Sequence, residues 1–269
     1  MEISTFKEDL IGLKDFAEQM ERFIKVEQRY VAESLVISLN AGFGSGKSTF
    51  FKMWKKQIVE NNNLSLIEIN AWRDDYYNEP FIPLISTIIE IFKKDDNKKK
   101  TELINKAKKA LPFFRAVGNQ IVNKYTGLDI QAAKDSTNKE TSDSIFDSFF
   151  KKKEALKELK DSIKNSINNN QNILIFVDEL DRCRPDYAIS YLETIKHIFD
   201  IKGLTFILAV DRKQLEASAK AAFGAELNFA EYYRKFIHRE IDLPKPEARS
   251  YERFASKYIN FYLQKENER

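Results

Sequence analysis

Cysteine and histidine are scarce in this sequence. Cys183 is the single cysteine among 269 residues, and the two histidines, His197 and His238, lie far apart. One cysteine excludes an internal disulfide framework and a cysteine-rich zinc site, and it fits a reducing compartment. The separation of the histidines argues against a histidine metal site as well.

Long apolar runs are also missing. No segment reaches the roughly 18 uninterrupted apolar residues that a transmembrane helix needs. The longest attempt, 111–122, is broken by Arg115, Asn119 and Gln120. The N-terminus carries acidic residues and has no basic region followed by an apolar run, so it does not resemble a secretory signal. We therefore expect a cytoplasmic chain with no transmembrane segment.

Neither sign of charge dominates. The 44 basic and 41 acidic residues leave a net charge of +3, so overall electrostatics does not support a nucleic-acid or membrane-surface partner. Two lysine-rich stretches, 93–100 and 151–160, are interleaved with acids, which favours solvated helix faces over nucleic-acid patches. With 43% hydrophobic residues, the chain can bury a substantial core.

Apolar periodicity predicts strands that alternate with helices. Strand composition is found at 35–39, 64–70, 173–179, 204–210 and 236–243. Helical spacing is found at about 6–30, 47–59, 186–200 and 213–222, and a further helix begins at 251. This alternation indicates an α/β fold with a mainly parallel sheet.

We divide the chain into three parts. Residues 1–34 form an N-terminal helix that leads into the core, and residues 35–245 form the core itself, with a helical, charge-rich insertion at about 79–170. Residues 246–269 begin a C-terminal helical region. A helix that starts so close to the end of the sequence is consistent with a chain cut from a longer protein.

A glycine-rich turn joins the first strand to the next helix. The candidate phosphate-binding residues are Gly42, Phe43, Gly44, Ser45, Gly46, Lys47, Ser48 and Thr49. Such a loop directs backbone N–H groups inward at a helix N-terminus, where they can bind a multiply anionic phosphate chain. We expect Lys47 to contact the β- and γ-phosphates of ATP, and the Ser48 hydroxyl to ligate Mg²⁺. The usual lead glycine is replaced by Ala41, which cannot fully copy its conformational role.

Acidic residues follow two of the buried strands. Asp178 ends the strand at 173–179, where it can hold Mg²⁺, and the adjacent Glu179 can activate the attacking water. Asp211 follows the next strand. It can sense the γ-phosphate or orient water, or it can simply cap the helix that follows.

Several residues near these acids have open roles. The arginines at 182 and 184 can meet phosphate, pair with local acids or contact a neighbouring subunit. The candidates for an arginine finger are Arg182, Arg184, Arg212 and Arg234. Cys183 has no recognisable base partner, so we interpret it as a small buried residue. Trp72, at the end of the second strand, is either part of the site or a core residue.

Five motifs together resemble the KAP family of P-loop NTPases. They are Gly-Phe-Gly-Ser-Gly-Lys-Ser-Thr, Asn-Ala-Trp-Arg, Val-Asp-Glu-Leu-Asp-Arg-Cys-Arg-Pro, Phe-Ile-Leu-Ala-Val-Asp-Arg and Tyr-Tyr-Arg-Lys-Phe-Ile. KAP proteins belong to the additional-strand class, related to the STAND and AAA+ ATPases. The resemblance implies a three-layer fold with a five-stranded sheet in the order 5-1-4-3-2, in which the Asp211 strand lies between the P-loop and Asp178 strands.

The chain departs from the family pattern in two further places. Glu179 is often an aspartate in the family, and by analogy with related ATPases the glutamate favours hydrolysis. Many members carry transmembrane helices between the P-loop and the second acidic motif, whereas the interval 79–170 is too polar to span a bilayer.

The resemblance also implies a function. We expect an ATP-hydrolysing switch or motor in a bacterial signalling or phage-defence complex, with a protein partner or a second copy of the chain. One alternative is a nucleotide-dependent assembly module with little turnover. Another is a nucleic-acid translocase, although no aromatic and basic groove is evident. The sequence leaves the preference for ATP or GTP open.

Overall fold

The computed structural model describes residues 3–9, 11–61, 65–91, 97–126, 142–167 and 172–267. Its centre is a five-stranded sheet made of β1 (Leu35–Asn40), β2 (Ser65–Asn70), β3 (Ile173–Asp178), β4 (Leu204–Val210) and β5 (Arg239–Asp242). The strand order is β2-β3-β4-β1-β5, and every neighbouring pair is parallel. The predicted order is confirmed, with β4 between β1 and β3.

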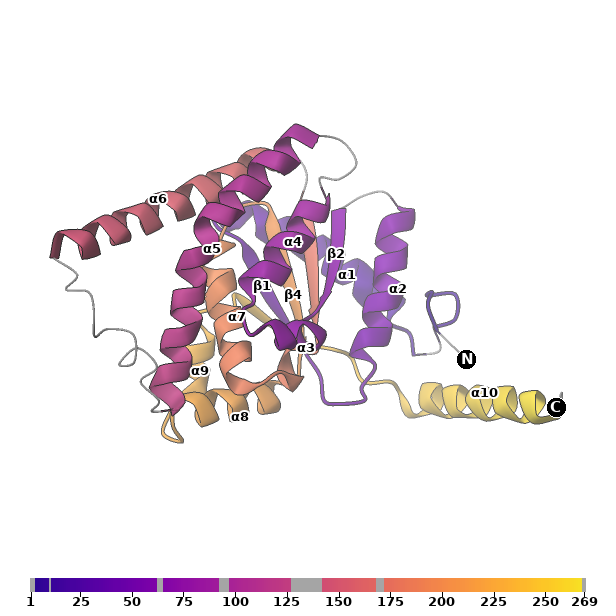
Figure 1. Ribbon diagram of the computed structural model, residues 1–269. Helices are drawn as coiled ribbons and strands as arrows, with labels where there is room; N and C mark the ends of the chain where they lie inside the picture. Colours follow the sequence, from indigo (N-terminus) through magenta and orange to yellow (C-terminus); the bar gives the residue numbers. More distant parts are fainter. Residues whose placement is uncertain are drawn as a thin grey trace.

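Helices cover both faces of the sheet (Figure 1), and successive side chains of β3 are buried alternately in one core and in the other. Leu174 and Phe176 of β3 pack under α1 (Lys14–Tyr30) and α2 (Lys47–Glu60). The Phe176 ring stacks on Phe51 of α2 at a centroid distance of 4.3 Å. Ile173, Ile175 and Val177 face the opposite core.

That opposite core is covered by a larger group of helices. It contains buried side chains of α4 (Phe81–Ile91), α7 (Pro185–Ile198), α8 (Arg212–Phe223) and α9 (Phe229–Tyr233). A strand that is buried on both faces is a near-continuous apolar run, which explains the composition of β3 and β4. The three-layer α/β architecture is therefore confirmed.

The insertion between β2 and β3 is helical in its described parts. It begins with α3 (Ala71–Asp74) and the short 3₁₀ helix η1 (Asp75–Tyr77), and continues through α4, α5 (Asn97–Thr126) and α6 (Ser142–Ser166). Lys106 of α5 contacts Glu158 of α6 at 2.7 Å. Residues 92–96, 127–141 and 168–171, which include part of the predicted lysine-rich stretch 93–100, lie outside the described ranges. Within those ranges, no helix has the length and apolar character needed to cross a membrane.

Three predicted element starts are wrong by three residues or more. The first helix begins at Lys14, because the Asp9 carboxylate accepts the backbone N–H groups of Ile11, Gly12 and Leu13, and Gly12 adopts a φ of +85°. The turn prevents the helix from extending back to residue 6, where the spacing of apolar residues predicted its start.

The last strand begins at 239 rather than 236. Tyr233 ends α9, and its carbonyl oxygen accepts the N–H groups of Phe236 and Ile237. These bonds form a turn where the apolar composition suggested a strand. The predicted C-terminal helix is present as α10 (Ala248–Asn267), but it begins three residues before the predicted start at 251.

Candidate active site at the carboxyl ends of the strands

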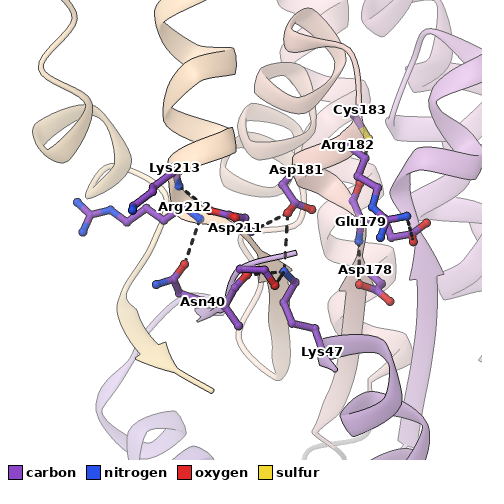
Figure 2. A network of polar contacts seen from close by, with 12 residues as sticks. Asn40, Lys47, Asp178, Glu179, Asp181, Arg182, Cys183, Asp211, Arg212 and Lys213 are labelled. Atoms are coloured by element: carbon purple, nitrogen blue, oxygen red, sulfur yellow. Dashed lines mark hydrogen bonds and ion pairs between the residues drawn. The ribbon is translucent and has the colours of Figure 1, made fainter. Parts of the chain in front are cut away.

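The predicted site residues follow the carboxyl ends of adjacent parallel strands. The glycine-rich loop follows β1, Asp178 ends β3, and Asp211 follows β4 (Figure 2). The strand register aligns these ends, because Asn40 pairs with Val210 and Asn70 pairs with Asp178. Open α/β sheets bind their ligands at this edge.

The loop between β1 and α2 has the backbone of a phosphate cradle. Gly44 and Gly46 adopt φ values of +74° and +91°, which side chains rarely allow. Gly46 is the N-cap of α2 and offers no side-chain acceptor, so the first N–H groups of the helix are left for a ligand. Ala41, in place of the lead glycine, is not among the residues with positive φ. The substitution therefore causes no backbone strain.

Lys47 is folded back onto the loop. Its Nζ donates to the carbonyl oxygens of Ala41 and Gly42, and it lies 3.8 Å from Oδ2 of Asp181. The side chain is only 10% exposed. The ammonium is thus held beside the cradle by groups that a phosphate oxygen can replace.

Asp178 lies close to Ser48, the other predicted metal ligand. The Ser48 hydroxyl and the Glu179 backbone N–H donate to the Asp178 carboxylate, the latter at 2.9 Å. Burial raises the pKa of Asp178, and these two hydrogen bonds oppose the shift. A carboxylate and a hydroxyl are hard oxygen donors of the kind that Mg²⁺ prefers. The two side chains therefore fit a magnesium site.

Both carboxylate oxygens of Glu179 are engaged. Oε2 accepts from Nδ2 of Asn70 at 2.8 Å, and Oε1 pairs with Nη1 of Arg182 at 2.6 Å. The Glu179 backbone has a φ of +62°, a left-handed conformation that costs a non-glycine residue about 1 kcal/mol. Strain of this kind is concentrated at functional sites.

Arg182 lies between two exposed aromatic rings. Its guanidinium carbon is 4.9 Å from the ring centre of Phe43 and 5.9 Å from that of Trp72. Trp72 is 54% exposed, so its interpretation as a core residue is wrong. Phe43 belongs to the phosphate loop, and the arginine therefore connects that loop to Glu179.

Asp211 and Asp181 join β4 to the rest of the site. The Asp211 side chain accepts the N–H of Lys213 and caps α8, which is one of the two roles predicted for it. The backbone N–H of Asp211 donates to Oδ2 of Asp181 at 2.7 Å. Since the same oxygen faces Lys47, Asp181 links the end of β4 to the P-loop lysine.

Within the described part of the chain, no hydrogen bond or ion pair joins Arg184, Arg212 or Arg234 to Asp178 or Glu179. Arg184 binds the buried Asp75 through its backbone N–H and its Nε, each at 2.9 Å. Arg212 pairs with Glu240 at 3.3 Å, and Arg234 is exposed. Their roles as arginine fingers stay predictions.

Cys183 is a buried residue, as its interpretation from the sequence required. Burial strongly raises the pKa of its thiol. A raised pKa disfavours the thiolate, which is the nucleophilic form.

The predicted nucleotide residues together line a cavity of about 260 Å³. It is bounded by Gly42, Phe43, Gly44, Ser45, Gly46, Lys47, Ser48, Thr49, Asp178, Glu179, Asp181 and Arg182. All eight loop residues and both members of the carboxylate pair are present. Asp211 does not line it.

Sequence reasoning assigned no individual role to Asn70 or Asp181. Asn70 ends β2 in a polar cluster, and that cluster was the available signal, because the ends of β2 and β3 are adjacent in the sheet. Asp181 was considered as a partner for arginine and as a substitute for Glu179, but not as a partner for Lys47. Its contact with Lys47 depends on η2 (Leu180–Arg182), which turns the chain back toward the loop.

Comparison with known proteins gives one family match. A model of the KAP family P-loop domain matches residues 14–269. No curated protein matches the chain significantly.

Among solved structures, the ORC2 protein of Aeropyrum pernix, solved as ADPNP–ADP complexes, has 16% identity and a TM-score of 0.40. The match covers 90% of this chain and 50% of that one. The Walker-type ATPase paby2304 of Pyrococcus abyssi has 13% identity and a TM-score of 0.39, with 93% and 58% covered. The matches span about half the length of these proteins.

Proposed function

The chain belongs to the KAP family of P-loop domains, and on that premise we propose that it binds Mg-ATP and hydrolyses it. The observation that carries the proposal is the cavity of about 260 Å³, where the phosphate loop and the carboxylate pair share one space. Phosphoryl transfer depends on positioning and on charge stabilisation around the γ-phosphate. The cavity brings together backbone N–H groups, a lysine and two carboxylates for that purpose.

Each residue has a proposed task. Lys47 exchanges its carbonyl and Asp181 contacts for phosphate oxygens and offsets their charge. Ser48 and Asp178 hold Mg²⁺, which, when bound, neutralises charge on the β- and γ-phosphates. Glu179 orients the attacking water and accepts its proton. Asp211 is proposed as a further residue of the reaction, acting from the end of β4.

A second function is favoured by the two contacts that hold the Glu179 carboxylate. Glu179 is held by Asn70 and Arg182, and a carboxylate bonded at both oxygens is poorly placed to accept a proton from water. This arrangement supports a nucleotide-dependent assembly module with little turnover until a partner releases Glu179. In either case we propose, from the family resemblance, a cytoplasmic module of a bacterial signalling or phage-defence complex.

The experiment is phosphate release from ATP and GTP by the purified chain, with its mass in solution measured in parallel. The control is Lys47→Ala, which removes the side-chain cation of the cradle and should weaken nucleotide binding severely. Binding within about twofold of wild type, on the order of 0.4 kcal/mol, would show that the loop is not the phosphate site. Saturable binding with no phosphate release and a nucleotide-dependent mass would favour the assembly module.

A further inference from the structure

Four large aromatic side chains are exposed at and beside the phosphate loop. Phe43 belongs to the loop itself, whereas Trp72, Tyr76 and Tyr77 follow β2 in the consecutive short helices α3 and η1. Each of the four is between 54% and 83% exposed. Aromatic rings provide much of the buried surface of protein cores and interfaces. A group of them outside the core therefore indicates a surface that contacts a ligand.

Arginine side chains are interleaved with these rings. The guanidinium of Arg182 lies between the rings of Phe43 and Trp72. The rings of Tyr76 and Tyr77 meet edge to face, with their centres 5.4 Å apart. We call this surface the aromatic-arginine platform and define it by Phe43, Trp72, Arg73, Tyr76, Tyr77 and Arg182. Its residues come from three separate segments of the chain, which explains why no such surface is evident in the sequence.

The ion pairs at the platform have their arginine outside and their acid inside. They join Arg73 to Asp74, Arg182 to Glu179 and, at the border of the platform, Arg184 to Asp75. The arginine side chains are 40–77% exposed, whereas the acidic side chains are only 10–18% exposed. An anion can therefore approach the guanidinium groups more closely than the carboxylates, although the formal charges of the pairs cancel.

This combination of groups matches one class of ligand. The bases of a single-stranded nucleic acid stack on aromatic rings and on guanidinium planes, and its phosphates pair with arginine. A protein partner would be better matched by aliphatic side chains, which help to fill the apolar core of an interface. Among the described residues, no large exposed aliphatic side chain belongs to the phosphate loop, α3, η1 or η2. We propose that the aromatic-arginine platform binds single-stranded nucleic acid.

The platform also touches the candidate active site. Phe43 and Arg182 line the cavity of about 260 Å³, and Arg182 holds the Glu179 carboxylate at 2.6 Å (Figure 2). A base or phosphate that binds the guanidinium competes with Glu179 for it, so a bound strand should increase the rate of ATP hydrolysis. This coupling rests on the proposed function, whereas the binding of the strand does not.

The test is the fluorescence anisotropy of a labelled oligothymidylate, titrated at low salt with the nucleotide-free chain. A length of about 12 nucleotides lies in the range that single-strand sites cover. Trp72→Ala and Tyr76→Ala should each weaken binding by at least about fivefold, because each removes a stacking ring. Trp72→Phe and Tyr76→Phe keep a ring and should bind within about twofold of wild type. Tyr30→Ala is the matched control, because Tyr30 is 82% exposed but ends α1, ahead of β1. It should bind normally.

Salt dependence tests the contribution of the cations. Arg73→Gln should weaken binding and lower the slope of log affinity against log salt by about one, as expected for the loss of a single phosphate contact. Arg73→Lys keeps the charge and should keep the slope. An unchanged slope for Arg73→Gln would remove Arg73 from the site.

The contrary outcomes are distinct. The inference would be overturned if wild type failed to bind the strand, or if the folded Trp72→Ala and Tyr76→Ala variants, checked by thermal unfolding, bound it normally. Equal affinity for a duplex of the same length would also overturn it, because the faces of paired bases are already stacked. A changed mass in solution for these variants, with unchanged strand affinity, would identify the platform as a contact between copies of the chain.

The outcomes also separate the platform from the proposed function. Lys47→Ala should bind the strand normally, since strand binding needs no nucleotide. If the wild-type chain binds the strand but releases no phosphate from ATP, the proposed function fails and the platform stands. If the chain hydrolyses ATP at a rate that a saturating strand does not change, the coupling through Arg182 is wrong.

Discussion

Arg182 restrains Glu179, and removal of its guanidinium should increase the rate of ATP hydrolysis. The Nη1–Oε1 distance is 2.6 Å, and Asn70 holds the other oxygen at 2.8 Å. A general base must be able to reach the proton that it accepts. Arg182→Ala frees one carboxylate oxygen of Glu179. In a larger fraction of molecules, this oxygen should then be able to accept the proton of the attacking water.

The size of the effect follows from the exposure of the pair. The Arg182 side chain is 40% exposed and that of Glu179 is 17% exposed. Hydrogen bonds to charged groups contribute roughly 1.5–3 kcal/mol, and exposed ion pairs contribute about 0.2–1 kcal/mol. Because solvent screens the pair, we assign it about 1 kcal/mol. Loss of that free energy would increase the fraction of molecules whose Glu179 is free of Arg182 by about fivefold. Because Asn70 still holds Oε2, fivefold is the upper bound.

The assay is steady-state phosphate release at saturating Mg-ATP, with nucleotide affinity measured separately. Arg182→Lys is the control, since a lysine keeps a cation within reach of Glu179 and should stay near the wild-type rate. A tenfold or larger decrease for Arg182→Ala at unchanged affinity would refute the reasoning. It would show that the guanidinium takes part in phosphoryl transfer.

Three further outcomes test other parts of the site and the fold. Asp178→Asn should weaken the Mg²⁺ dependence of nucleotide affinity in calorimetric titrations, and an unchanged Mg²⁺ dependence would place the metal elsewhere. Asp211→Ala removes a helix N-cap, so it should lower the free energy of unfolding in urea by about 1 kcal/mol. Asp211→Asn keeps a capping oxygen and should lower that free energy by only a few tenths of a kcal/mol. Equal losses in the two variants would argue against the cap. Burial lowers the pKa of His238 from the usual 6.5, and its neutral Nδ1 accepts the Val36 N–H at 3.0 Å. A lowered folded-state pKa means that wild type loses stability as the pH falls below 6.5 and through the lowered pKa. His238→Asn, which has an acceptor but no titration, should lose less over that interval, and identical pH profiles would contradict the assignment.

The phosphate loop and the pair Asp178 and Glu179 could be predicted from the sequence because each is formed by residues that are neighbours along the chain. Positive φ at Gly44 and Gly46 and the start of α2 at Lys47 need only neighbouring residues. The sheet order could not be obtained from periodicity, which gives strands but not their neighbours. It came from the family resemblance.

Contacts between distant segments could not be predicted. The bond between Asn70 and Glu179 joins residues 109 positions apart, and so does the pair formed by Asp75 and Arg184. The apolar spacing also predicted the wrong start for the first helix, because a local turn interrupts the helical pattern there. The Asp9 carboxylate ends the helical spacing before α1 by accepting three backbone N–H groups.

The central claim is that Glu179 activates the water that attacks the γ-phosphate. The most direct measurement is single-turnover cleavage of ATP by wild type and Glu179→Gln, with equilibrium binding of Mg-ATP measured on the same preparations. The amide is nearly isosteric but cannot accept the proton, so cleavage should slow by roughly a hundredfold or more. Affinity should hold or rise, because a negative charge near the γ-phosphate is removed. Cleavage at the wild-type rate by Glu179→Gln would contradict the account and move the catalytic role to Asp181 or Asp211.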